Sequence, residues 1–80
     1  MNAKEAVAKR IVDLCAKRNI TINALANNAG ISPSTVYSML NQKSKNPGIV
    51  TIKKLCDGLV MTVGEFFNTE EFNSLEQELE

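Results

Sequence analysis

The sequence contains no histidine and no tryptophan, and its 80 residues include one tyrosine, two cysteines and two prolines. Without histidine, the chain lacks the side chain that most often serves as a general base near neutral pH and as a metal ligand. The sequence also shows no glycine-rich phosphate loop and no cluster of residues with metal-ligand spacing. We therefore expect no enzymatic activity, no metal site and no cofactor.

Long apolar runs are absent too, because no stretch approaches the roughly 18 residues of a membrane span. The opening segment, MNAKEAVAKR, has no apolar core of the kind that a secretory signal needs. We therefore expect a cytoplasmic protein without a membrane partner. Cys15 and Cys56 lie far apart, each within an apolar helical pattern, and in a reducing compartment they are expected to be core thiols rather than a disulfide.

The net charge is zero, but the charges are segregated along the chain. Residues 1–64 hold all nine basic residues and three acidic ones, for a net charge of +6. Residues 65–80 hold six glutamates and no basic residue, for a net charge of −6. Such asymmetry is typical of a basic body that carries an acidic tail. A tail that only keeps the terminus solvated is the simpler alternative.

The most informative stretch is ITINALANNAGISPSTVYSMLN, residues 20–41, which predicts two short helices joined by a tight turn. Ser32 is a favoured N-cap, and Pro33 follows it at the first helical position, where the missing N–H has no cost. Thr21 is the candidate cap of the preceding helix. Gly30 is placed to end that helix in the left-handed conformation. Two helices this close, with a glycine between them, are typical of a helix-turn-helix.

Three further helices are expected from apolar spacing and caps, so the chain should be all-α. The first spans about residues 3–18, with an apolar stripe along one face and Asn19 as its left-handed end. Another spans about residues 49–58, after a turn at Asn46, Pro47 and Gly48. A short helix over residues 63–67 should be capped by Thr62.

The pattern ITxxxLAxxAGISPSTVYSxLN, followed by NPGIVTIKKLCDGLVMTVGEFF, resembles the Xre/Cro type of phage repressor and bacterial regulator. The resemblance covers about residues 7–67. It implies a compact five-helix, lambda-repressor-like DNA-binding domain over residues 1–67, with residues 68–80 as an acidic tail or short helix. It also implies sequence-specific binding of double-stranded DNA, with the helix over residues 33–41 in the major groove.

The family's base-reading positions correspond here to Pro33, Ser34, Tyr37 and Ser38. None of these carries the side chains that make discriminating bidentate contacts to bases, so the sequence does not predict a base preference. Contacts to phosphate are expected from a second set of residues: Arg10, Thr21, Ile22, Asn23, Thr35, Asn41, Lys43, Lys45 and Asn46.

Three positions in this reading carry an alternative or a departure from the family. Ile22 stands where relatives commonly have a glutamine, so only its backbone N–H is expected to reach a phosphate. For Arg10, a side chain that lies along its own helix is as plausible as a phosphate contact. Cys15 and Leu40 replace an arginine and a glutamate that pair in many relatives, and we hypothesise that these two apolar side chains touch.

A homodimer is expected, because the family often dimerises through its last helix. The interface candidates are Phe66, Phe67, Phe72, Leu75 and Leu79, with one of the two adjacent phenylalanines expected inward and the other interfacial. The last three would share a face if the tail were a helix capped by Asn68 or Thr69. Three arrangements of the tail fit the sequence: it docks on its own body, pairs with a second subunit or stays frayed. Competition of the tail with DNA for the basic body is a further alternative.

Two functions fit these features. The first is a small transcriptional regulator that binds DNA as a homodimer, with repression favoured over activation. The second is an antitoxin or another protein-interaction module on the same scaffold, with weak or lost DNA binding and an acidic tail that holds a protein partner.

Overall fold

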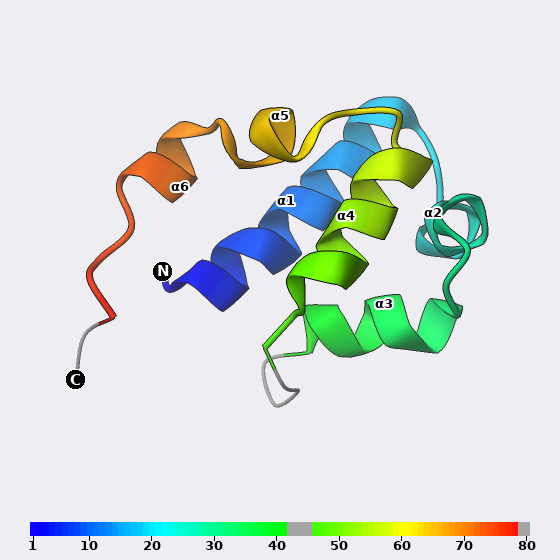
Figure 1. Ribbon diagram of the computed structural model, residues 1–80, viewed down its shortest axis with the longest axis horizontal. Helices are drawn as coiled ribbons and strands as arrows, with labels where there is room; N and C mark the ends of the chain where they lie inside the picture. Colours follow the sequence, from blue (N-terminus) through cyan, green and yellow to red (C-terminus); the bar gives the residue numbers. More distant parts are fainter. Residues whose placement is uncertain (42–45, 79–80) are drawn as a thin grey trace.

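The computed structural model describes residues 1–41 and 46–78, so the predicted site residues Lys43, Lys45 and Leu79 lie outside the described residues. All regular elements in the described part are helices (Figure 1). They are α1 (Ala3–Arg18), α2 (Ile22–Ala29), α3 (Pro33–Leu40), α4 (Ile49–Gly58), α5 (Val63–Phe67) and α6 (Glu70–Asn73). The predicted all-α class is confirmed. Within these residues, none of the helices is long and apolar enough to cross a membrane.

The predicted caps begin and end the helices as expected. Thr21, Ser32 and Thr62 each accept a hydrogen bond from a backbone N–H in the first turn of α2, α3 and α5. Asn19 and Gly30 adopt left-handed conformations, with φ of 55° and 72°, at the ends of α1 and α2. Thr21 is the N-cap before α2. Asn41, the last residue of the helix predicted over residues 33–41, is the C-cap that follows α3.

The start of α1 carries a cap that the sequence analysis did not include. The Asn2 side chain accepts from the Glu5 N–H at 2.8 Å, and the Glu5 carboxylate accepts from the Asn2 N–H at 3.0 Å. This reciprocal pair satisfies two N–H groups that no residue within the helix can reach.

The core is formed by residues from α1, α2, α3, α4 and α5, with α2 packed against α4 and α3 (Figure 1). Leu25, Val36, Leu55 and Phe66 are fully buried there. Cys15 and Cys56 are also buried and free, which confirms the prediction of core thiols. Burial raises the pKa of both thiols, so they are protonated at neutral pH and poor nucleophiles.

Helices α2 and α4 approach each other closely at Gly58. A Cβ atom on this glycine would lie 2.9 Å from the backbone nitrogen of Ala29 and 3.0 Å from its Cα. Backbone atoms cannot rotate away as a side chain can, so any larger residue at position 58 must push the two helices apart. Because α2 is also packed against α3, this contact sets the position of the helix-turn-helix.

Replacing Gly58 with alanine is expected to lower the free energy of unfolding by about 1–2 kcal/mol, since overpacking outweighs the gain in helix propensity. Gly64→Ala is the matched control, because a Cβ at Gly64 would meet only the Thr62 hydroxyl at 3.8 Å. That variant should be neutral or stabilised. Urea unfolding followed by circular dichroism measures both, and equal changes in the two variants would contradict the close-approach argument.

Two arginines of α1 hold α5 and the end of α4. Arg10 Nε donates to the carbonyl of Phe66 at 2.8 Å, and its Nη2 donates to the carbonyl of Glu65 at 3.0 Å. The guanidinium also lies 5.9 Å from the centre of the Phe66 ring. Arg18 donates to the carbonyl of Leu59. These bonds satisfy carbonyls near helix ends and fix α5 on α1.

The segment after α5 packs on the body through an aromatic cluster. The centroid of the Phe72 ring lies 4.8 Å from that of Phe67 and 6.2 Å from that of Phe66. The centroids of the Phe66 and Phe67 rings are 5.0 Å apart. Phe66 is fully buried, so its predicted place in a dimer interface was wrong, whereas Phe67 and Phe72 are half-buried. Phe66 is thus the inward ring of the pair.

The tail helix is shorter than the spacing of its apolar residues suggested. Thr69 caps α6, but the helix ends at Asn73, where the Ser74 side chain donates to the carbonyl of Glu70 at 2.6 Å. Leu75 therefore lies beyond the helix and does not continue the helical face of Phe72, so the condition for the shared face is not met. A helix this short has no stability of its own and persists only where Phe72 packs.

Candidate nucleic-acid interface

Helix α3 has one face in the core and one in solvent. Val36 and Met39 point into the core, as the sequence pattern predicted. Ser34, Tyr37 and Ser38 are exposed, with 53% of Tyr37 accessible, while Pro33 is half-buried in the first turn. Three of the four predicted base-facing residues thus form an exposed arc. The structure contains no DNA, so their contact with bases stays a prediction.

Hydroxyl groups cluster at the start of α3. The Ser32 hydroxyl accepts from the Thr35 N–H at 3.3 Å and lies 2.9 Å from the Ser34 hydroxyl and 3.1 Å from that of Thr35. The cap therefore holds both neighbouring hydroxyls in place. Each hydroxyl can donate or accept a hydrogen bond, which suits contact with phosphate or with several bases.

The start of α2 lies open toward solvent. The Thr21 side chain accepts from the Ala24 N–H at 3.0 Å, and its carbonyl accepts from the Leu25 N–H at 3.0 Å. The N–H groups of Ile22 and Asn23 precede the first intrahelical bond and remain at the positive end of the helix. The Ile22 side chain packs against the core, so only its backbone N–H is available to an anion.

The turn before α4 brings Asn46 next to α3. A cleft of about 340 Å³ separates the turn from the helix, and it is lined by Thr35, Ser38, Met39, Asn46, Pro47, Gly48 and Thr51. Two predicted phosphate residues and one predicted base-facing residue therefore share this cleft. Asn46 is exposed at its edge.

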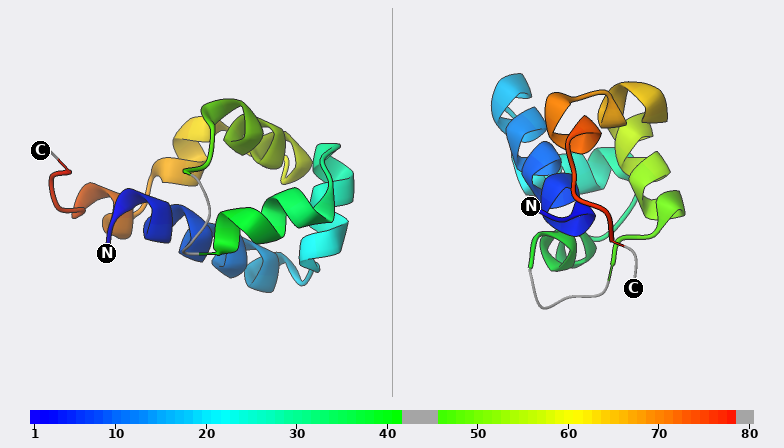
Figure 2. Two further views of the ribbon diagram at one scale, coloured as in Figure 1. Left: turned by 90° about the horizontal axis from the view of Figure 1, so that it is seen from below. Right: turned by 90° about the vertical axis from the view of Figure 1, so that its left-hand side faces the viewer.

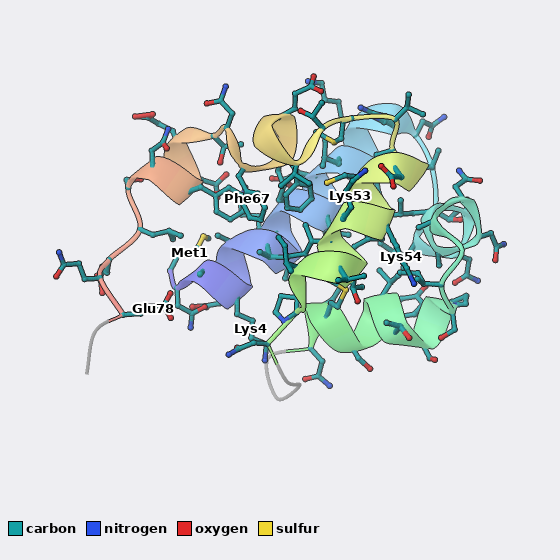
Figure 3. All side chains as sticks on the ribbon, in the orientation of Figure 1. Met1, Lys4, Lys53, Lys54, Phe67 and Glu78 are labelled. Carbon is teal, nitrogen blue, oxygen red and sulfur yellow. The ribbon has the colours of Figure 1, made fainter. Side chains whose placement is uncertain are left out.

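Lys4 is a candidate that the sequence did not indicate. It lines a cleft of about 260 Å³ with Asn41 and a second cleft of about 420 Å³ with Asn46. Figure 3 shows Lys4 at the first turn of α1, near the end of α3. Only the packing of α1 against α3 brings this lysine to the interface, and no local pattern in the sequence could have indicated it.

Arg10 lies elsewhere. Its guanidinium donates to two carbonyls of α5, and α5 lies on the far side of the α1 and α4 pair from α3 (Figures 1 and 2). Neither of the two alternatives describes this side chain, because it crosses from α1 to α5 instead of lying along its own helix, and it lies apart from the predicted phosphate residues. We therefore leave Arg10 out of the interface.

No charged side chain stands on α3, whose sequence is PSTVYSML. Any attraction to a polyanion must therefore come from other residues. The candidates are the open start of α2, Lys4, and the predicted phosphate contacts Lys43 and Lys45. This division separates groups that can provide affinity from groups that can read bases.

Leu40 is half-buried and packs against the core cluster that includes Cys15. Direct contact between the two side chains stays a prediction. We expect a double-mutant cycle of Cys15→Ala and Leu40→Ala to give a coupling of at least about 0.5 kcal/mol in urea unfolding, as residues in contact generally do. If the two losses of unfolding free energy simply add, the side chains of Cys15 and Leu40 do not touch, and they do not take the place of the family's ion pair.

These features define the chain as a helix-turn-helix domain. The family model described as the Cro/C1-type HTH DNA-binding domain matches residues 10–71, and the chain belongs to this family. This match confirms the resemblance noted in the sequence. Members of this family are DNA-binding domains and in general are not enzymes.

Among solved structures, the crystal structure of the prophage Lp1 protein 11 is similar to this chain. The two are 37% identical in sequence and superpose with a TM-score of 0.82, over 94% of this chain and 100% of that chain. No match was found among curated proteins.

Proposed function

We propose that this protein is a small transcriptional regulator that binds double-stranded DNA sequence-specifically, with α3 in the major groove. The observation that carries the proposal is the exposed arc of Ser34, Tyr37 and Ser38 on a helix whose opposite face lies in the core. Ser38 also lines the cleft that α3 shares with Asn46. A major groove admits one α-helix, and an arc of small polar residues beside one aromatic ring suits close approach to base edges.

Phosphates on either side of the groove would be held by the flanks of α3. The backbone N–H groups of Ile22 and Asn23 would face one strand, together with the hydroxyl of Thr35. Asn41, Asn46, Lys43 and Lys45 would grip the other stretch of backbone, with Lys4 at its edge. Because each neutralised phosphate releases counterions, affinity should fall steeply as salt rises.

The functional unit in this proposal is a homodimer that represses transcription. Two copies of α3 would reach half-sites about 34 Å apart, one turn of DNA. With Phe66 buried, the partner surface would come from the half-buried Phe67, Phe72 and Leu75, together with Leu79. Occupying an operator is sufficient for repression, which is the role that we assign.

Replacing Tyr37 with alanine tests the placement of α3. We expect binding to a duplex selected from a random pool to weaken about tenfold, because a desolvated aromatic contact contributes about 1–2 kcal/mol. Binding to a scrambled duplex should change little. Fluorescence anisotropy measures both, and Asn73→Ala, an exposed polar residue on α6, is the control. Equally weaker binding to both duplexes would show that Tyr37 contacts phosphate rather than bases. Unchanged binding to both would show that α3 does not lie in the interface.

A further inference from the structure

The acidic tail returns to the start of α1. After α6, the chain runs beside the first turn of α1, and the Glu78 carboxylate accepts a hydrogen bond from the Ala3 N–H at 3.0 Å. Figure 3 shows Glu78 at the same end of α1 as Met1 and Lys4. This contact joins residues 75 positions apart in the sequence.

A second attachment fixes the course of the tail. On α6, Glu71 forms an ion pair with Lys9 of α1 at 3.2 Å, and Phe72 lies in the aromatic cluster with Phe66 and Phe67. The hydrogen bonds that Lys9 makes to Asp13 and Glu71 raise its pKa, so it stays charged. The tail is thus attached to α1 at both of its ends, at α6 and at Glu78.

The position of Glu78 places negative charge at the edge of the proposed DNA interface. Glu78 lines the cleft of about 420 Å³ that is also lined by Lys4, Asn46 and Pro47. Asn46 is a proposed phosphate contact, and Lys4 lies beside Asn41 in the neighbouring cleft. Glu76 lies two residues before Glu78 in the same exposed segment.

A phosphate that reached Asn46 would therefore approach one or two carboxylates. Charges closer than the Debye length, about 8–10 Å at physiological salt, repel each other appreciably. The same carboxylate also occupies the N–H of Ala3 and lies beside Lys4, groups that would otherwise attract an anion.

We propose that residues 75–78 form an autoinhibitory contact that lowers the affinity of this protein for DNA by charge repulsion at the Asn46 edge of the interface. The inference rests on the proposed DNA binding and adds a means of regulating it. Because the tail reads no bases, it weakens binding to an operator and to any other duplex by the same factor. Anything that displaces the tail, including a protein partner that binds it, would strengthen DNA binding.

The test compares two variants with the unaltered protein and with one control. Glu78→Gln removes the charge but keeps an oxygen that can accept from Ala3. The double variant Glu76→Gln with Glu78→Gln removes both carboxylates and leaves Leu75 and Leu79 of the proposed dimer surface in place. Glu70→Gln on α6 is the control, because it changes the net charge by the same amount as Glu78→Gln away from the cleft. Binding to a selected and to a scrambled duplex is measured by anisotropy at about 50 mM and about 300 mM salt.

At low salt, Glu78→Gln should bind about twofold to threefold more tightly and the double variant about threefold to tenfold, equally on both duplexes. The gain in affinity should shrink at high salt, and Glu70→Gln should gain less than half as much as Glu78→Gln. The NMR amide signal of Ala3 should shift in Glu78→Gln, which checks the contact in solution.

Other results would overturn the inference. Unchanged or weaker binding by the double variant, or an equal gain from Glu70→Gln, would contradict autoinhibition while leaving the proposed DNA binding in place. If neither the unaltered protein nor the double variant binds either duplex at low salt, the proposed function itself fails. Binding by the double variant alone would support both.

Discussion

Replacing Phe66 with alanine is expected to lower the free energy of unfolding by about 3–5 kcal/mol, enough to unfold most of a domain of this size at room temperature. The ring is fully buried, and it contacts the rings of Phe67 and Phe72. The Arg10 guanidinium lies over it and donates to the carbonyl of the same residue. Removing the ring therefore leaves a cavity where α1, α5 and α6 meet.

Phe67→Ala is the matched control for this prediction. Phe67 is half-buried and its ring lies in the same cluster, so its loss should cost about 1–2 kcal/mol, in proportion to the smaller area that it buries. Urea unfolding followed by circular dichroism gives both values. A loss below about 1 kcal/mol for Phe66→Ala, or equal losses for the two variants, would show that the core does not centre on Phe66.

Reversing the charge of Lys43 and Lys45 together is expected to weaken DNA binding by about 100-fold or more at low salt. Each substitution removes an attraction to phosphate and adds a repulsion, and α3 itself has no charge to compensate. The melting temperature should not change, since both lysines are predicted to contact the phosphate backbone of DNA. Anisotropy on a selected duplex measures the affinity, and circular dichroism measures the melting temperature.

The single variant Lys45→Glu should lose part of the affinity that the double reversal removes. Lys53→Glu is its control, because each of the two substitutions changes the net charge by the same amount. Lys53 pairs with Asp57 on α4 and lies outside the proposed interface (Figure 3). Its reversal should weaken DNA binding much less. A protein-interaction module that binds its partner through the tail would tolerate all of these changes, so intact partner binding with no DNA binding by the unaltered protein would favour that function instead.

Much of the fold could be predicted because short-range chemistry specifies it. Ser32 followed by Pro33 marks the start of α3, and Gly30 and Asn19 mark the ends of α2 and α1 at left-handed positions. Each of these signals acts within one helical turn, so the sequence carries it directly. The buried face of α3 followed in the same way from the spacing of Val36 and Met39.

The parts that could not be predicted depend on contacts between distant residues. Nothing local indicates that Arg10 would bond to α5, that Lys4 would lie beside Asn41, or that Glu78 would reach Ala3. Val60 is a further example: it is 89% exposed with φ of 55°, a conformation unfavourable for a β-branched residue. The packing of α4 and α5 imposes that turn against local preference.

The proposed function depends above all on α3 reading base sequence in the major groove as part of a dimer. We would first select bound duplexes from a random DNA pool, at low and at moderate salt. We expect enrichment of an inverted repeat that survives moderate salt, with half-site centres about 10 base pairs apart. Binding only at low salt, with no enriched sequence, would show instead that the basic body attracts phosphate without reading bases.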